Sequence, residues 1–289
     1  MTQALQVVKK DVVDFVESKV KEFQQSGEVH FPPSYSPQNA LKSAWLILQE
    51  TQDRSNNPAL SVCTRDSVAN ALLDTVIQGL SPSKKQVYFI VRGNKLCADR
   101  SYFGTMSVTK RIKGVDDVFA QVIYKGDDFV FTIDRGTKKV LKHDQKLENI
   151  DTKNIVGAYC SIYYRGTDAE GNPEIREYTE IMSKAQIDTS WKKSPTKGGV
   201  HAEFPEEMAK RTVINRTCKM FVNTSDDSDI LVEAFNNTAG GDFNKEGAVE
   251  QEIEDNANQE IIDVEPEQVK KVEETKIEEP KAGQQELDF

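Results

Sequence analysis

Apolar residues recur every three or four positions in three stretches near the start of the chain, which predicts amphipathic helices over residues 7–23, 40–52 and 66–78. Gly27 ends the first helix and Gly79 ends the third, because glycine favours the position just after a helix. The segment HFPPSYSPQ is expected to be extended, since a residue that precedes proline avoids the helical region.

From residue 86 the pattern changes to the short apolar runs and turn residues of strands. QVYFIV and KLCAD surround Gly93-Asn94, which predicts a hairpin with a tight turn. Ser183 and Gln186 have the spacing of a capping box at a helix start. The other expected strands cover residues 118–124, 129–134, 139–142, 156–164 and 175–182, and the other helices cover 102–112, 185–191 and 204–222. This order predicts an α+β fold, with a central antiparallel sheet and hairpins flanked by helices.

Charge is divided unevenly along the chain. Residues 1–225 contain 32 Lys and Arg and 27 Asp and Glu, a net charge of +5, whereas residues 226–289 contain 5 and 20, a net charge of −15. The second segment is too polar to form a core, so we expect an acidic, largely disordered tail. Such a tail either competes with a polyanion for the basic body or only increases solubility. The expected units are an N-terminal helix and linker over 1–39, a candidate oligomer contact, a folded core over 40–225 and the tail over 226–289.

Cysteine usage and hydropathy indicate the compartment. Cys63, Cys97, Cys160 and Cys218 form no Cys-x-x-Cys pair, which argues against a disulfide framework or a zinc ribbon. The first residues lack the apolar region of a signal peptide, and no apolar run reaches the length of about 18 residues that a membrane span requires. The sequence therefore predicts a cytoplasmic protein with no membrane partner.

The last predicted helix carries the clearest candidate site. Arg211, Asn215 and Lys219 fall on one face at a spacing of four residues, flanked by Thr212 and Arg216. The apolar residues fall on the opposite side, so one face is predicted to pack while the other presents cations to phosphates. An ordinary solvated helix face is the alternative.

Two further segments combine cations with aromatic residues, a composition typical of surfaces that bind single strands. The alternatives are that their aromatic side chains, Phe103 above all, belong to the core, and that the second segment is plain surface. The candidate DNA-binding residues in them are Arg100, Tyr102, Lys110 and Arg111, followed by Trp191, Lys192 and Lys193.

Several enzyme motifs are missing from the chain. It contains neither a Walker A motif nor a glycine-rich dinucleotide fingerprint, and its three histidines form no zinc-binding pattern, so no cofactor or metal is predicted. The pairs Asp116-Asp117 and Asp127-Asp128 leave a magnesium-dependent nuclease open as an alternative. Their positions in predicted turns also suit local hydrogen bonding.

Two motifs together resemble the RecT family of phage single-strand annealing proteins. In that family a Gly-Leu … Tyr-x-Ile-x-x-x-Gly-Asn … Tyr-x-Gly stretch precedes a Glu-Met-x-x-Lys-Thr-x-Ile-x-Arg helix. The resemblance covers roughly residues 40–225, with Arg211 where lysine is commoner and Phe-Ile-Val-Arg where the family often has Pro-Tyr before glycine. The matching residues are Gly79, Leu80, Tyr88, Ile90, Gly93, Asn94, Tyr102 and Gly104, and then Glu207, Met208, Arg211, Thr212, Ile214 and Arg216.

The resemblance implies an ATP-independent annealing protein, not an enzyme, that binds single-stranded DNA and the annealed duplex. It also implies a homo-oligomer, a ring or helical filament, that works beside a phage exonuclease in homologous recombination. Phosphate contacts leave base edges free, so strand choice comes from Watson–Crick pairing. The residues expected to hold phosphates are Arg211, Arg216, Lys219 and Lys110, with Lys192 and Lys193 as secondary contacts.

The C-terminal residues QQELDF resemble the acidic tip of bacterial single-strand-binding proteins. Leu287, Asp288 and Phe289 are therefore candidate contacts for host single-strand-binding machinery, although a chance terminal phenylalanine is the alternative. A replication scaffold protein that binds no DNA also remains open beside the annealing protein and the nuclease.

Overall fold

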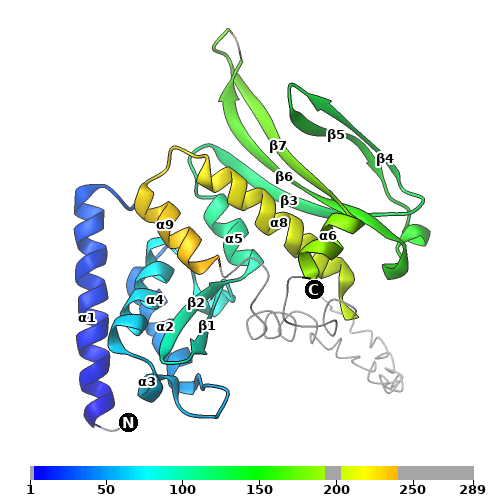
Figure 1. Cartoon of the computed structure of the whole chain (residues 1–289). Coiled ribbons are helices and arrows are strands. Elements are labelled where there is room, and N and C mark those ends of the chain that lie inside the picture. The colour runs from blue at the N-terminus through cyan, green and yellow to red at the C-terminus, as the bar shows by residue number, and fades with distance from the viewer. Residues whose placement is uncertain (1–2, 169, 193–202, 240–289) are drawn as a thin grey trace, which may run out of the picture.

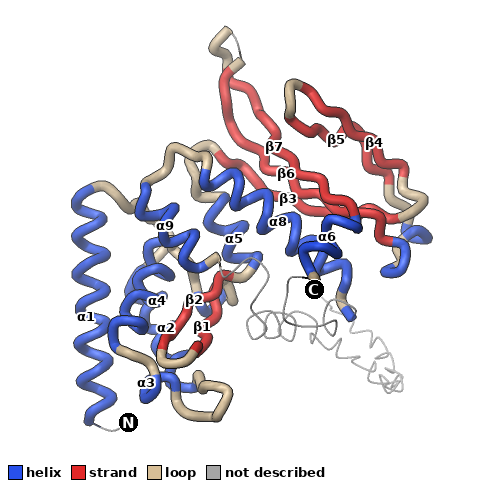
Figure 2. Tube along the Cα trace, viewed as in Figure 1, coloured by secondary structure: helices blue, strands red, loops and turns tan. Residues whose placement is uncertain are grey.

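The computed structural model of the chain describes residues 3–168, 170–192 and 203–239. A helical lobe and a five-stranded sheet lie on either side of the long helix α8 (Pro205–Asn223), as Figure 1 shows. Figure 2 shows that helices dominate one side of the molecule and strands the other. The predicted α+β class with a central antiparallel sheet is confirmed.

The helical lobe is built from α1 (Gln3–Ser26), α2 (Pro37–Glu50), the short α3 (Ala59–Val62) and α4 (Arg65–Ile77). The side chains of Ser36 and Thr64 cap α2 and α4 by accepting a hydrogen bond from the backbone N–H three residues later, at 3.3 Å in each case. These helices confirm the three predicted from hydrophobic periodicity.

Helix α1 does not stand apart from the core as the predicted boundary at residue 39 implies. It packs along α4, and its apolar face is at most 4% exposed at Val12, Val16 and Val20. These three valines belong to the same hydrophobic cluster as Trp45 and Leu72. The apolar face of α1 is therefore occupied within the chain, which leaves its other side for any contact with a second subunit.

A hairpin follows the helical lobe, as predicted. Strands β1 (Val87–Arg92) and β2 (Lys95–Arg100) pair antiparallel across a turn in which Gly93 has a φ of 62°. Helix α5 (Tyr102–Thr109) begins directly after β2, because the Ser101 side chain accepts a hydrogen bond from the Gly104 N–H at 3.0 Å. It ends three residues before the predicted boundary at residue 112.

The large sheet has the strand order β3-β6-β7-β5-β4, with every neighbouring pair antiparallel. Ser183 and Gln186 form the predicted capping box at the start of α6 (Lys184–Trp191). In the described part of the chain, three short 3-10 helices connect the larger elements, at Pro82–Lys84, Leu147–Asn149 and Thr152–Asn154. The five strands are β3 (Val115–Tyr124), β4 (Asp128–Asp134), β5 (Thr137–Asp144), β6 (Ile155–Thr167) and β7 (Pro173–Ser183).

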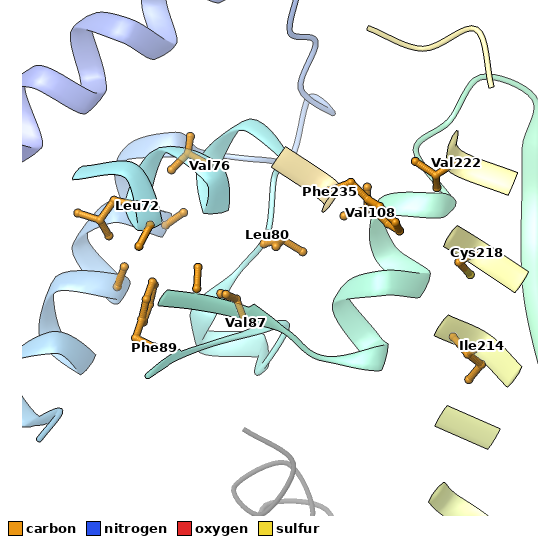
Figure 3. Close-up of a cluster of buried hydrophobic side chains, with 14 of the residues drawn as sticks. Leu72, Val76, Leu80, Val87, Phe89, Val108, Ile214, Cys218, Val222 and Phe235 are labelled. Atoms are coloured by element: carbon orange, nitrogen blue, oxygen red, sulfur yellow. The ribbon is translucent and has the colours of Figure 1, made fainter. Parts of the chain in front are cut away.

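One continuous core joins the hairpin, α4, α5 and α8. Figure 3 shows apolar side chains of all these elements converging, with the side chain of Phe235 from a further helix among them. On the sheet side, α8 packs mainly against β6, with β3 and β7 on its flanks. Helix α8 is therefore held on several sides, which fixes the direction in which each of its polar side chains points.

The tail predicted from residue 226 begins with a folded helix, α9 (Asp229–Thr238). Ser228 caps it, Phe235 is fully buried, and the helix packs on α4. Four acidic residues between positions 226 and 233 hide the apolar stripe of α9 when composition is averaged over the whole segment. The predicted boundary at residue 225 therefore falls inside the folded unit. The remainder, including Leu287, Asp288 and Phe289, lies outside the described residues.

None of the helices in the described ranges combines the length and the hydropathy needed to span a bilayer.

Candidate nucleic-acid interface

Helix α8 is the element that organises the candidate site. Pro205 occupies its first turn together with Glu206 and Glu207, whose carboxylates complement the positive end of the helix, as predicted. The Glu206 carboxylate accepts a hydrogen bond of 2.5 Å from the Tyr124 hydroxyl at the end of β3. This contact ties the start of α8 to the sheet.

Arg211 does not point to solvent, although it was predicted to be exposed. It is half-buried and its Nη1 atom is fully enclosed. Burial lowers the pKa of its guanidinium to about 10, against the opposing influence of Tyr88, Tyr102 and Asp99. The prediction was wrong because α5 packs on α8, and Tyr88, Tyr102 and Asp99 lie close to Arg211.

The two family-like motifs meet around this arginine. Tyr88 comes from β1 and Tyr102 from the start of α5, while Glu207 and Arg211 lie one turn apart on α8. Burial and the nearby Glu207 carboxylate, to which the hydroxyl is also hydrogen-bonded, raise the pKa of Tyr102 to about 12, against the opposing influence of Arg211. We call Tyr88, Tyr102, Glu207 and Arg211 the motif cluster. These polar residues, distant in sequence, therefore share one structural junction.

A second set of polar residues follows α8 on another side. Thr212, Arg216, Lys219 and Asn223, here called the α8 stripe, are separated by four, three and four residues and therefore share a face. Arg216 is exposed, and no carboxylate of the described chain lies within 4.0 Å of it in an ion pair. Lys219 is half-buried beside it, and Asn215 is half-buried next to the stripe.

Helix α6 supports one end of the α8 stripe. The indole N–H of Trp191 donates a hydrogen bond of 2.9 Å to the Thr212 hydroxyl, and the Lys184 ammonium lies 5.0 Å from the centre of the Trp191 ring. Lys192, directly after the tryptophan, is exposed. The sequence made Trp191 a candidate DNA contact, and this hydrogen bond favours a supporting role at the α6 corner.

Comparison with known families identifies the family of the chain. The RecT family model matches residues 38–261, which is most of the chain. The chain belongs to the RecT family. A comparison with individual curated proteins gives no match. Membership implies a single-strand annealing protein of phage recombination, and such proteins are generally not catalytic enzymes.

Two arginines predicted to bind DNA serve the interior of this RecT-family protein. Arg100 is only 8% exposed, and its Nη1 atom lies 2.7 Å from oxygens of Gln78, Phe235 and Thr238. Arg111 donates hydrogen bonds to the Gln78 carbonyl and, at 3.2 Å, to the Ser107 hydroxyl. Burial lowers the pKa of its guanidinium. The sequence could not reveal that Arg100 and Arg111 are buried, because nothing in the local sequence distinguishes an arginine that donates to buried oxygens from one on the surface.

The other residues predicted to contact DNA lie partly on the surface and partly in the motif cluster. Lys110 is exposed and ion-paired with Asp117, an arrangement weak enough for phosphates to replace. Tyr102 belongs to the motif cluster, and Lys193 lies outside the described residues. Phe103, expected in the core, is 39% exposed, and its ring centre lies 4.2 Å from that of Tyr102. This exposed ring at the motif cluster is a candidate base-stacking surface, a role that the sequence argument weighed and set aside in favour of the core.

The acidic pairs that suggested a nuclease are engaged in local contacts. The Asp127 carboxylate accepts hydrogen bonds of 2.9 to 3.0 Å from the Tyr124 N–H and from the side chains of Gln145 and Asn149. Asp117 pairs with Lys110 and accepts from the Val118 N–H. Within the described ranges, no three His, Cys, Asp or Glu side chains gather in a geometry that suits a metal ion.

Proposed function

We propose that this RecT-family protein binds single-stranded DNA and anneals complementary strands without ATP. In this proposal Arg216 and Lys219 of the α8 stripe, together with Lys192, hold phosphates, while the base edges of the strand remain free to pair. The observation that carries the proposal is the exposed Arg216, which forms no ion pair with a carboxylate of the described residues. It lies one turn from Thr212 and the α6 corner, on the helix that bears the family motif.

The chemistry of these side chains suits binding of a strand through its phosphates, without recognition of its bases. Lysine and arginine neutralise phosphates of any sequence, so affinity depends on salt and not on base identity. Three cations on one protomer would give a slope of log affinity against log salt of about −2 for single strands. Phe103 adds a ring on which one base can stack without sequence preference.

Each protomer offers few phosphate contacts, so stable binding of a strand is favoured when several protomers bind it together. When several linked copies bind one strand, each later contact forms at a high effective concentration, so weak sites sum to stable binding. We therefore propose a homo-oligomer, a ring or helical filament, that holds both the single strand and the new duplex. A phage exonuclease that supplies single strands and host single-strand-binding machinery at Leu287, Asp288 and Phe289 are proposed partners, and the proposed compartment is the cytoplasm.

The test mixes two complementary labelled oligonucleotides with the full chain, without nucleotide, and follows both pairing and strand length across a salt series. We expect faster pairing of intact strands, with an effect that declines as salt rises. The variant R216E/K219E should lose most of this activity. Its matched control, K42E/K153E, reverses two exposed lysines on α2 and on the turn before β6 and should retain it.

The other outcomes identify the alternatives. Shortened strands in the presence of Mg²⁺ would indicate the nuclease. Intact strands that neither bind nor pair faster would leave the scaffold protein. Equal loss of activity in the two double variants would show that overall charge matters and the α8 stripe does not.

A further inference from the structure

The segment after α9 contains a stretch of acidic residues, here called the acidic run, that is not interrupted by lysine or arginine. Between Lys245 and Lys270 the chain has no Lys or Arg, whereas four lysines separate the carboxylates after residue 269. Only the first part therefore resembles a polyanion. Its nine acidic residues are Glu246, Glu250, Glu252, Glu254, Asp255, Glu260, Asp263, Glu265 and Glu267.

The described chain ends beside the α8 stripe. Asn236 of α9 and Asn223 at the end of the stripe exchange two side-chain hydrogen bonds, of 2.8 and 3.3 Å. Ala239 follows Asn236 by three residues, which is less than one helical turn. The chain thus leaves the folded unit next to the end of the surface that carries Arg216 and Lys219.

The distances allow the acidic run to reach this surface. From Thr212 to Asn223 the α8 stripe extends about 16 Å along the helix axis. The seven residues from 240 to 246 can span up to about 25 Å. Both the start of the run and its later carboxylates can therefore lie along the stripe, toward Lys192 at the far end.

We infer that the acidic run, residues 246–267, docks on the α8 stripe of its own chain and competes there with single-stranded DNA. The inference rests on the proposed function, because it assigns a regulator to the same surface. Carboxylates on the run take the places of phosphates at Arg216, Lys219 and Lys192. A long strand that engages several protomers displaces the run at low concentration, whereas a short strand requires a higher concentration.

The expected change in the apparent Kd for DNA follows from the fraction of molecules in which the acidic run does not occupy the α8 stripe. Exposed ion pairs are individually weak, so docking remains reversible, but attachment to the same chain keeps the run at a high local concentration. If the run occupies the stripe in about 80 to 90% of molecules, the apparent Kd for DNA is about five to ten times higher than that of the open form. Screening by salt reduces this difference.

The first experiment compares two full-length variants with equal net charge. In one, Glu250, Glu252, Glu254, Asp255 and Glu260 of the run become Gln or Asn. In the other, Glu273, Glu274, Glu278, Glu279 and Glu286 become Gln. The readout is the Kd for a short labelled oligothymidine at low salt. We expect about five- to tenfold tighter binding in the first variant and less than a twofold change in the second. Equal tightening in both would overturn the inference, because it would indicate a general charge effect.

A second experiment locates the contact directly. A carbodiimide, which joins a carboxylate to a lysine amine without a spacer, is applied to an equal mixture of ¹⁴N- and ¹⁵N-labelled protein and followed by mass spectrometry. We expect links from the acidic run to Lys219 or Lys192 within one isotope population, and their loss when long single-stranded DNA is added. Links that form only between isotopes, or that persist with DNA, would overturn docking within the chain.

The two proposals fail in different ways. If no variant binds DNA, the proposed function fails. If DNA binds through Arg216 and Lys219 but neutralising the run changes nothing, the proposed function stands and the docked run is wrong.

Discussion

The guanidinium of Arg100 stacks on the ring of Phe235, 3.5 Å from its centre, and donates a hydrogen bond of 2.7 Å to the carbonyl oxygen of the same residue. Its Nε donates to the Thr105 hydroxyl at 3.1 Å. One side chain therefore ties the end of β2 to α5 and to α9, more than a hundred residues later in the chain. Arg100 is therefore a buried structural residue that holds α9 against β2 and α5. No feature of the sequence around Arg100 indicates this role.

Replacement of Arg100 should therefore release α9. In R100M the acceptors on Gln78, Phe235 and Thr238 lose their donor inside the protein, and we expect a loss of about 3 kcal/mol or more in the free energy of unfolding. Hydrogen exchange over residues 229–238 should accelerate first. R65M, at an arginine exposed on α4, is the control and should change stability little. Unchanged exchange in α9 would contradict the role of Arg100.

Charge reversal at two arginines of α8 should affect different properties: stability at Arg211 and DNA binding at Arg216. Arg211 is enclosed close to Asp99, so R211E buries an additional carboxylate there and should reduce stability by about 3 kcal/mol or more. Arg216 is exposed, so R216E should leave the thermal midpoint nearly unchanged and weaken DNA binding. Thermal melts and binding assays on both variants check this. Equal midpoints would mean that Arg211 is not enclosed in solution.

Stability should fall as pH rises through the titration of Asp74 on α4. Burial, with a further contribution from Glu233, raises the pKa of this carboxyl to about 6, although Asn237 donates a hydrogen bond to it. The unfolded value is about 3.9, so between about pH 4 and 6 the folded chain binds more protons and becomes less stable as pH increases. D74N should remove this dependence and add about 1 to 2 kcal/mol at pH 7.5.

The control for Asp74 lies on the same helix. Asp66, exposed in the first turn of α4, should give no comparable gain when changed to Asn. Chemical unfolding at pH 4.5 and pH 7.5 measures both variants. A gain for D74N that is the same at the two pH values would show that protonation of Asp74 is not its cause.

The contact between Trp191 and Thr212 should appear as a coupling energy. W191F and T212V each remove the hydrogen bond of 2.9 Å while keeping most of the packing. If the bond stabilises the α6 corner, the double variant should lose about 1 kcal/mol less stability than the sum of the single variants. Additive losses would show that the two side chains act independently, and would return Trp191 to the list of candidate stacking residues.

Gly104 should tolerate no side chain. A Cβ atom at this position would overlap the backbone carbonyl oxygen of Gln86 and lie 2.6 Å from Cγ of Arg100. G104A should therefore reduce stability by about 2 kcal/mol or more, since backbone must move. Gly93 has a positive φ but open space around it, so G93A measures conformational strain alone, about 1 kcal/mol. Similar losses for the two variants would exclude steric overlap as the reason for Gly104.

Local sequence signals determined most of the secondary structure. Hydrophobic periodicity predicted α1, α2, α4 and α8, and turn and capping residues predicted the hairpin and the start of α6. These signals act between residues a few positions apart, so they can be read without knowledge of the fold. The motif resemblance also identified the RecT family, and one of its residues, Gly104, lies where a side chain would overlap the Gln86 carbonyl.

Only the tertiary structure decided which cations face solvent. Periodicity places Arg211 and Arg216 on α8 but cannot tell that the first is enclosed near Tyr88, Tyr102 and Asp99 while the second is exposed. The same holds for Arg100, whose partners on α9 lie in a segment that composition marked as an acidic tail. The physical reason is that burial depends on contacts between elements distant in sequence, whereas charge and helical spacing are properties of the local chain.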